Sequence, residues 1–387
     1  MNYPLAQINL SALQHNLAIV RQHTAAKILA MVKANAYGHG LIAVAKALQS
    51  AEGLGVARLE EALALREAGI KQKIVVMTGF LNAEELESFI KHDLDAVVHS
   101  EFQLELLEKY RHPREGGDPV DVGLFDCFAI SRKPTYFPLA RERRGKIKIW
   151  LKLDCGMHRL GFLPAEAESA YQRLMQCELV QKPLTFLTHF PNADAKEDTL
   201  TQEQTQQFLQ VVKFWEDEKS LSNSACILVN RATQDNWVRP GIMLYGASPF
   251  AHLSAQQFNL KPVMTLRSQL IAIRHFKKGS AIGYGGHWVC PEDMPVGVVA
   301  IGYGDGYPRH AKSGTPVLIN GQQASLIGRV SMDTISIDLR SIENPAVDDE
   351  VILWGEGLSA DVVAAHAETI SYELFCRLTG RVKFQHI

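Results

Sequence analysis

Apolar runs of strand length alternate with helical patterns through the first two-thirds of this 387-residue chain. A buried parallel strand is nearly continuous in apolar residues, and the runs of this kind span residues 27–37, 53–57, 73–80, 94–100, 146–154, 183–190, 225–230 and 237–246. Repeated strand–helix units favour a parallel sheet, and eight of them in about 240 residues favour a closed barrel. The sequence therefore predicts an α/β fold built on a (β/α)₈ TIM barrel.

Signals at the ends of the helical segments support this alternation. Ser11 is expected to cap the first helix. Gly69 is a favourable stop for the helical segment that precedes it. Ser100 with Gln103 resembles a capping box ahead of a further helix.

A doubly wound sheet is the structural alternative to the barrel. Nucleotide-binding sheets of that type usually carry a glycine-rich phosphate loop after a strand. The chain contains neither G-x-G-x-x-G after a strand nor G-x-x-x-x-G-K-[ST], so the barrel is favoured.

From about residue 256 the strand patterns follow one another without intervening helices. Asn320-Gly321 between two apolar runs is a hairpin signal, and Ser359 is placed to start a short helix. We therefore expect two domains: a barrel over residues 1–255 and a smaller, mainly antiparallel β domain over residues 256–387.

Residues 111–145 fit neither pattern, since they contain four Pro, four Gly and six Arg with few regular apolar repeats. A loop of this length inside a compact domain is either functional or a surface insertion. An insertion with a solvated surface is the ordinary interpretation, and an anion site at the arginines is the alternative.

Composition and charge narrow the class of protein. Lys and Arg number 40 against 42 Asp and Glu, a net charge of −2 that gives no reason to expect nucleic acid or a membrane surface as partner. The opening MNYPLAQINL has no basic segment followed by an apolar stretch, and no apolar run reaches membrane-spanning length. The six cysteines are scattered and form no C-x-x-C pair. The sequence contains no H-E-x-x-H motif and no cluster of acidic residues typical of a metal site. A cytoplasmic protein without a metal site is expected.

Lys33 is the strongest single clue to chemistry, because it ends an apolar strand within VKANAYGHG. Burial disfavours the charged form of lysine, so its pKa falls and the amine becomes nucleophilic. At the C-terminal end of a barrel strand it would face the usual active-site mouth, where Schiff-base formation with a carbonyl is its natural use. A lysine that extends to solvent is the alternative.

Further polar groups end later strands. LKLDCGMHRLGF contains Lys152, Asp154, His158 and Arg159, which suggest a barrel mouth or, equally, a structural ion-pair network. His189 follows another apolar run, although a lone histidine is more often a core residue.

Hydroxyl and glycine motifs complete the candidates. SNSA, with Ser224, could hold a phosphate where a helix begins, or could serve only as a cap. Arg239 precedes Pro-Gly at the eighth strand. The β domain holds IGYGGHW with Tyr284, and IGYGDGYPR with Tyr303 and Tyr307. A tyrosine exposed between glycines can transfer protons, but packing of its ring in a turn is the more frequent case.

Taken in order, these motifs resemble the alanine racemase family of the pyridoxal-phosphate fold-type III class. The resemblance covers nearly the whole chain through VKANAYGHG, LKLDCGMHRLGF, THFPNAD, SNSA, WVRPGIMLYGASP, IGYGGHW, IGYGDGYPRH, GRVSMD and SYELFCRL. Nine motifs in the family's order are highly specific. The resemblance implies the same architecture, a (β/α)₈ barrel followed by a β domain.

The resemblance also implies roles for individual residues. Lys33 would form the aldimine with pyridoxal 5'-phosphate and act as one acid/base group, and Tyr284 would be the second base on the opposite face of the substrate. Groups that match positions holding the phosphate and cofactor are Tyr37, Ser224, Gly241, Ile242 and Tyr372. Arg239 would contact the pyridine nitrogen, with His189 in the same network.

Substrate contacts follow from the same resemblance. Arg159 would orient the cofactor oxygen and the substrate carboxylate, and Met332, with Asp333 beside it, would offer that carboxylate a backbone N–H. Lys152 matches a lysine that is carbamylated in some family members, which would give Arg159 a negative partner.

The family's activity is the interconversion of L- and D-alanine, either to supply D-alanine for peptidoglycan or in alanine catabolism. Its active sites are shared across a homodimer, so a homodimer is expected here. The alternatives are a decarboxylase of the same barrel class, a pyridoxal-phosphate-binding protein without turnover, and a metal-free aldolase barrel. Arg239, the Tyr284 motif and the β domain argue against them.

Overall fold

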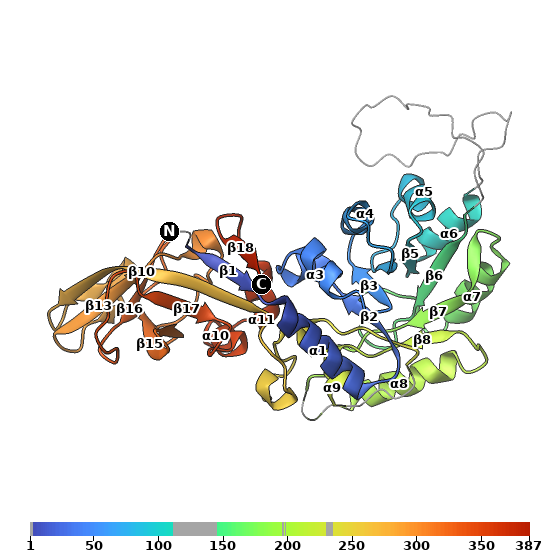
Figure 1. Ribbon diagram of the computed structural model, residues 1–387. Coiled ribbons are helices and arrows are strands. Elements are labelled where there is room, and N and C mark those ends of the chain that lie inside the picture. The colour runs from blue at the N-terminus through green and yellow to red at the C-terminus, as the bar shows by residue number, and fades with distance from the viewer. Residues whose placement is uncertain (1–2, 111–144, 196, 198, 230–234) are drawn as a thin grey trace.

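The computed structural model describes residues 3–110, 145–195, 197, 199–229 and 235–387. Figure 1 shows two bodies, a barrel of strands surrounded by helices and an elongated β domain, with the long strand β10 (Met264–Phe276) running outward from the junction. The expected insertion at 111–145 lies, apart from its last residue, outside the described residues. No helix in the described part of the chain is long and apolar enough to cross a membrane.

Eight parallel strands form the barrel: β2 (Lys27–Met31), β3 (Gly53–Val56), β4 (Lys73–Val76), β5 (Asp95–Val98), β6 (Ile147–Lys152), β7 (Val180–Leu187), β8 (Glu218–Ser220) and β9 (Trp237–Val238). Their order is β8-β7-β6-β5-β4-β3-β2-β9. Two hydrogen bonds link β8 with β9 and the residue before it. The Asn236 N–H donates to the Lys219 carbonyl at 2.9 Å, and the Ser220 hydroxyl donates to the Trp237 carbonyl at 2.8 Å. The sheet is thus closed, as a barrel requires.

Helices cover the barrel: α1 (Leu10–His23), α3 (Leu41–Ala47), α4 (Leu59–Glu67), α5 (Ala83–Lys91), α6 (Glu101–Lys109), α7 (Ala167–Gln176), α8 (Leu200–Val211) and α9 (Ser224–Leu228). α1 buries Leu13, Leu17 and Val20 on one face, which is the stripe that helical spacing predicts. Its N-cap is Asn9, whose side chain accepts the Ala12 N–H at 2.9 Å, so the prediction of Ser11 was wrong.

Two further local predictions need correction. The run 225–230 was predicted to form the seventh barrel strand, but its residues 225–228 lie in α9, where Asn223 caps the helix by accepting the Cys226 N–H. Residue 230 lies outside the described residues. The strand is β8, three residues with the sequence EKS, which offer no apolar run to detect. Before α6, Ser100 is the N-cap residue, but Gln103 accepts the His99 N–H instead of completing a capping box.

The second sheet contains β1 (Leu5–Ile8), β10, β13 (Met294–Val299), β14 (Pro316–Ile319), β15 (Gln322–Ile327), β16 (Ile335–Asp338), β17 (Glu350–Trp354) and β18 (Lys383–His386). Its neighbours are antiparallel except for β1 with β18. β14 and β15 form the hairpin predicted from Asn320-Gly321, with positive φ at both residues. The prediction of a (β/α)₈ barrel followed by a mainly antiparallel β domain is therefore confirmed.

In Figure 1 the C-terminus lies at the junction between the bodies, close to the end of β18, and β18 pairs with β1 near the start of the chain. The division expected at residue 255 places Leu5–Ile8 with the barrel, yet this strand pairs with β10 and β18 of the second sheet. Helices α10 (Ala360–His366) and α11 (Ser371–Cys376) complete the β domain, and Ser359 caps α10 as predicted. α11 reaches back to the barrel, since a Cβ built at Gly38 would lie 2.1 Å from the Phe375 carbonyl oxygen.

Candidate active site

Five of the predicted site residues gather at the C-terminal ends of the barrel strands. Lys33 follows β2 after Val32, Lys152 ends β6, His189 lies two residues after β7, and Arg239 follows β9. The pKa of His189 is held well below its ordinary value, first by burial and then by the charges of Arg239 and Lys152. The charges of Arg159, the fifth of these residues, and of Lys33 also lower the pKa of His189. We call these five side chains the mouth cluster.

Lys33 begins a turn with an unusual backbone. The four residues after it, Ala34 to Tyr37, all have positive φ between 51° and 54°, and Gly38 follows at 78°. Left-handed geometry costs L-residues roughly 1–2 kcal/mol each and rarely persists beyond one residue. Lys33 is solvent-accessible at the mouth, while burial of its amine and the nearby Arg159 lower its pKa below that of an ordinary lysine. A larger fraction of its amine is therefore neutral and nucleophilic at a given pH than in an ordinary lysine.

Lys152 is buried among cations at the end of β6. Burial first, and then Arg159 and Arg239, lower its pKa to about 8. Asp154 opposes that shift, but its carboxylate is already engaged by backbone donors of the following turn. Burial alone would raise the pKa of Asp154, and the N–H groups of His158, Gly156 and Arg159 outweigh it, so the net pKa is lowered.

That carboxylate fixes the path of the chain into Arg159. Asp154 accepts the N–H groups of His158 at 2.9 Å and Arg159 at 3.0 Å. The side chains of His158 and Arg159 are exposed. Asp154 therefore shapes the turn that presents Arg159, and the ion-pair network considered from sequence is mainly a set of backbone hydrogen bonds.

Arg239 is almost fully buried and is held by neutral acceptors. Its Nη1 donates to Ser220 Oγ at 2.7 Å, and its Nη2 to the carbonyls of Thr188 at 2.6 Å and Leu221 at 3.1 Å. His189 Nδ1 lies 3.3 Å from Nη2. Burial lowers the pKa of Arg239 to about 10. No acceptor for Nε occurs among the residues that the structure describes, so this donor is available to a ligand.

The predicted phosphate residues form a second group beside Lys33. Ser224 Oγ accepts the Gly241 N–H at 2.9 Å, and a Cβ at Gly241 would lie 2.4 Å from Tyr37 Oη. Ile242 begins a 3₁₀ turn, Ile242–Tyr245, in which its own N–H is not used. The Tyr37 ring lies 5.9 Å from that of Tyr372, and burial raises the pKa of both hydroxyls. Hydroxyls and backbone donors thus converge where only glycine leaves room.

These features fit pyridoxal phosphate. Lys33 offers an amine with a lowered pKa for a carbonyl. Arg239 Nε, which has no acceptor among the described residues, is a donor for a ring nitrogen. The hydroxyls of Ser224 and Tyr37 and the backbone N–H of Ile242 supply the kind of donors that bind a phosphate. No group of three or more His, Cys, Asp or Glu side chains that could hold a metal occurs in the described ranges.

Among the described residues of one chain, Tyr284 and Met332 form no hydrogen bond or ion pair with the mouth cluster. Tyr284 begins a 3₁₀ turn between β11 (Ala281–Ile282) and β12 (Trp288–Val289) and is 67% exposed. Met332 is 52% exposed, and Asp333 beside it pairs with Arg381 at 2.8 Å. In the described part of the chain, no hydrogen bond or ion pair joins these residues to Lys33.

The other two tyrosines of the glycine motifs have different surroundings. Tyr307 is 1% exposed, and its ring stacks on Trp354 with a centroid distance of 6.1 Å, so the packing alternative holds for it. Tyr303 lies beside the Met332 loop, where its N–H donates to the Ser331 carbonyl. Both differ from Tyr284, whose ring is free at the surface.

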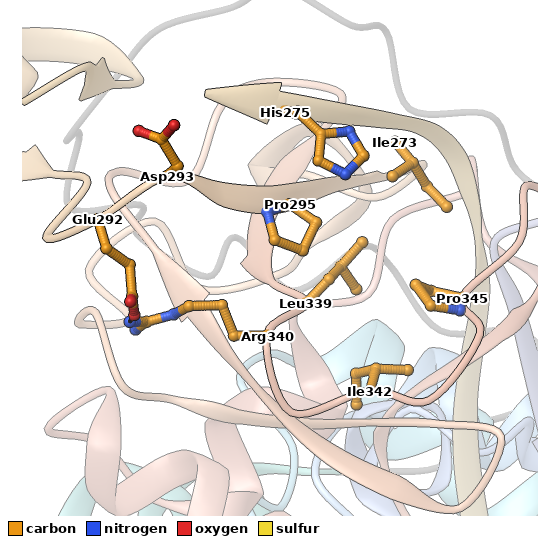
Figure 2. Close-up of a pocket in the computed structure, with 9 residues that line it drawn as sticks. All are labelled: Ile273, His275, Glu292, Asp293, Pro295, Leu339, Arg340, Ile342 and Pro345. Atoms are coloured by element: carbon orange, nitrogen blue, oxygen red, sulfur yellow. Dashed lines mark hydrogen bonds and ion pairs between the residues drawn. The ribbon is translucent and has the colours of Figure 1, made fainter. Parts of the chain in front are cut away.

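A separate pocket of about 530 Å³ lies in the β domain (Figure 2). Its apolar lining includes Ile273, Leu339 and Ile342, and Arg340 at its rim pairs with Glu292. None of the candidate site residues lines it. It is therefore not part of the candidate site.

Sequence reasoning missed Glu61 of α4. One of its carboxylate oxygens accepts the N–H of Ala34 at 2.6 Å, directly after Lys33. In the sequence this glutamate stands in an ordinary helical first turn, and only the fold shows what it contacts.

The chain is similar in sequence to alanine racemases over its whole length. Residues 8–249 match the family described as alanine racemase, N-terminal domain, and residues 263–386 match alanine racemase, C-terminal domain. The alanine racemase of Coxiella burnetii is 45% identical, with 100% of both chains covered. That of Nitrosococcus oceani is 46% identical, with 99% of each covered.

Solved structures agree. The biosynthetic alanine racemase from Pseudomonas aeruginosa superposes with a TM-score of 0.88 at 38% identity, covering 100% of both chains. The alanine racemase from Bacillus anthracis with bound L-Ala-P gives a TM-score of 0.80 at 27% identity, covering 100% of this chain and 95% of that one. The likeness thus includes both the barrel and the β domain.

Proposed function

The chain belongs to the alanine racemase family, and we propose that it interconverts L-alanine and D-alanine with Lys33 and Tyr284 as the two groups that transfer the α-proton. It is an isomerase, a pyridoxal-phosphate-dependent amino-acid racemase. The observation that carries the assignment of residues is the mouth cluster, in which a lysine with a lowered pKa stands among cations beside a set of phosphate donors.

Racemisation requires that an α-proton leave one face of the substrate and that a proton return to the other. When bound, pyridoxal phosphate supplies an electron sink that makes this α-proton more acidic. The lowered pKa of Lys33 makes its Nζ easier to deprotonate than that of an ordinary lysine, which suits it to accept the proton and to give it back. Tyr284 Oη would perform the same exchange from the opposite face, so the substrate need not turn over.

We propose a homodimer, because no hydrogen bond or ion pair joins Tyr284 to the mouth cluster among the described residues of one chain. Tyr284 and Met332 are large side chains left exposed on one chain. In the dimer, Tyr284 of the partner subunit would face Lys33, and the Met332 loop of that subunit would offer a backbone N–H to the substrate carboxylate. Asp333 in that loop forms an ion pair with Arg381 at 2.8 Å.

The remaining site residues would bind and orient. Phosphate contacts are assigned to Tyr37, Ser224, Gly241, Ile242 and Tyr372. Arg239 would donate from Nε to the ring nitrogen, with His189 packed beside it. Arg159 would hold the substrate carboxylate. Lys152 has a pKa lowered to about 8, which raises the neutral fraction of its amine and suits it to carbamylation. The carbamylated side chain would give Arg159 a negative neighbour.

The wider role follows from the same assignment. We propose that the protein works in the cytoplasm and supplies D-alanine for peptidoglycan or serves alanine catabolism. A fold-type III decarboxylase or a non-catalytic cofactor-binding protein is not favoured, because both domains match alanine racemase and Arg239 stands where an acidic partner would be expected in a decarboxylase.

The test is incubation of the protein and pyridoxal phosphate with L-alanine in deuterated water. We expect D-alanine that carries deuterium at the α-carbon, because the returning proton comes from a solvent-exchanged group. Inversion without deuterium uptake would contradict transfer through Lys33 and Tyr284. Uptake without inversion would contradict the role of Tyr284.

Arg239→Glu tests the contact with the ring nitrogen. Arginine does not readily release a proton, so it keeps that nitrogen unprotonated, whereas a carboxyl group can share a proton with it. We expect the ratio of transamination to racemisation to rise by about tenfold or more, which corresponds to roughly 1.4 kcal/mol. The measurement is pyruvate formed per D-alanine formed. Arg239→Lys, which keeps the positive charge, should change the ratio much less, and equal ratios in Arg239→Glu and the wild type would count against this role.

A further inference from the structure

Glu61 connects the turn after Lys33 with the next loop of the barrel mouth. Its Oε1 accepts the N–H of Ala34 at 2.6 Å and lies 3.4 Å from that of Asn35. Its Oε2 accepts the N–H of Ala57 at 2.8 Å and that of Arg58 at 3.2 Å. One carboxylate thus holds four backbone donors from two loops, those that follow β2 and β3.

The turn it holds is one that needs support. Four consecutive L-residues with positive φ cost several kcal/mol in sum, at roughly 1–2 kcal/mol each. Such strain persists only where the surroundings over-determine the backbone. Asn35 Oδ1 accepts the Leu41 N–H at 2.8 Å and fixes the far side of the turn, while Glu61 fixes the side next to Lys33.

Hydrogen bonds to an ionised carboxylate are about twice as strong as neutral ones. All four donors that face Glu61 are N–H groups, so only a group with acceptors at both ends satisfies them. Glutamine would turn one NH₂ group toward two of these donors, and that half of the contact would become repulsive.

We propose that Glu61 is a positioning residue for Lys33: by holding the Ala34 and Asn35 N–H groups, it fixes the left-handed turn that aims the Lys33 amine into the barrel mouth. The inference rests on the proposed role of Lys33. It assigns to Glu61 no contact with substrate or cofactor, only control of where the reactive amine stands. The negative charge of Glu61 also acts on Lys33, since it raises the lysine pKa against the larger effects of burial and Arg159.

Glu61→Gln is the test, with Glu85→Gln as the matched control. Glu85 lies in the first turn of α5 at the same end of the barrel, and its carboxylate accepts the Leu81 N–H at 2.8 Å without touching the Lys33 turn. Amide hydrogen exchange of Ala34 and Asn35 should speed up about tenfold or more in Glu61→Gln, as expected for the loss of a charged hydrogen bond. Glu85→Gln should leave exchange at these two amides unchanged.

Two readouts distinguish positioning from a purely structural role. In cofactor-free protein, the pH midpoint for reductive methylation of the Lys33 amine should shift to lower pH in Glu61→Gln, because a negative neighbour is lost. In the holoenzyme, kcat should fall between about 10- and 100-fold, while KM for alanine changes less than about threefold, as expected for a misplaced reacting group.

Unchanged amide exchange together with an unchanged methylation midpoint would overturn the proposal, even if the melting temperature fell. If Glu61→Gln does not fold, Glu61→Asp replaces it. The shorter side chain keeps the charge but should not reach both loops, so exchange at Ala34 must speed up while that at Arg58 stays slow, and protection of both would overturn the proposal. Exchange and methylation do not depend on turnover, so a chain that failed to racemise alanine would disprove the proposed function without deciding the role of Glu61.

Discussion

Lys33→Ala is expected to lower the rate of alanine racemisation by about 10⁴-fold or more, the largest loss that any single substitution in this chain should cause. The variant removes the Lys33 amine, which stands at the start of the strained turn, beside the phosphate donors. Among the described residues, no other amine stands at the start of that turn. It therefore removes both the covalent attachment point and one of the two proton-transferring groups. D-alanine formation from L-alanine, followed over time, is the measurement.

Lys27→Ala is the matched control, because Lys27 begins the same strand that Lys33 follows and its ion pair with Glu218 lies at the opposite end of the barrel. We expect its activity to stay within about threefold of the wild type, since surface ion pairs contribute little. Activity of Lys33→Ala above one-hundredth of the wild type would contradict the assignment.

Lys33→Ala should not be less stable than the wild type. The pKa of Lys33 is lower in the folded than in the unfolded chain, so holding its proton in the folded state costs free energy at every pH below the folded pKa. Alanine removes that cost over the pH range in which Lys33 is protonated in the folded chain. Loss of activity together with equal or higher resistance to denaturant would therefore separate chemistry from folding.

How much of the fold could be predicted from sequence depended on how visible each strand was. β3 and β4 are short but fully or almost fully buried, so they read as apolar runs, whereas β8 has the sequence EKS and its place was given instead to α9. β1 could not be assigned to the second sheet, because its partner β10 lies more than 250 residues away in the chain. Pairing over such distances leaves no local pattern.

The candidate site was likewise only partly predictable from the sequence. Lys33, Lys152, His189 and Arg239 could be placed at one mouth because the C-terminal ends of barrel strands meet there. The left-handed turn after Lys33 could not, since Ala, Asn, Ala and Tyr carry no sequence signal for four positive φ values. The turn depends on tertiary contacts, including the carboxylate of Glu61.

Tyr284→Phe is the second prediction with a large effect. The change removes one hydroxyl from a side chain that is 67% exposed, so stability should be nearly unchanged. Racemisation should fall by about 10²- to 10⁴-fold in both directions, because each direction needs a proton at the face that Tyr284 serves. Exchange of the α-proton for deuterium should persist for the one enantiomer whose α-hydrogen faces Lys33. Equal loss of exchange for both enantiomers would contradict a two-sided mechanism.

Combining the two variants tests whether the site is shared between subunits. In a dimer that pairs a Lys33→Ala chain with a Tyr284→Phe chain, a shared arrangement leaves one site with both groups intact and the other with neither. We therefore expect mixed dimers, isolated with two different affinity tags, to recover about half of the wild-type activity per dimer. That activity would be far above the activity of either parent variant, each of which should be lower than the wild type by about 10²-fold or more. If each site lay within one chain, no site in the mixture would hold both groups, and activity would stay at the level of the parents. An active monomer in sedimentation would lead to the same rejection, because Lys33 and Tyr284 have no contact among the described residues of a single chain.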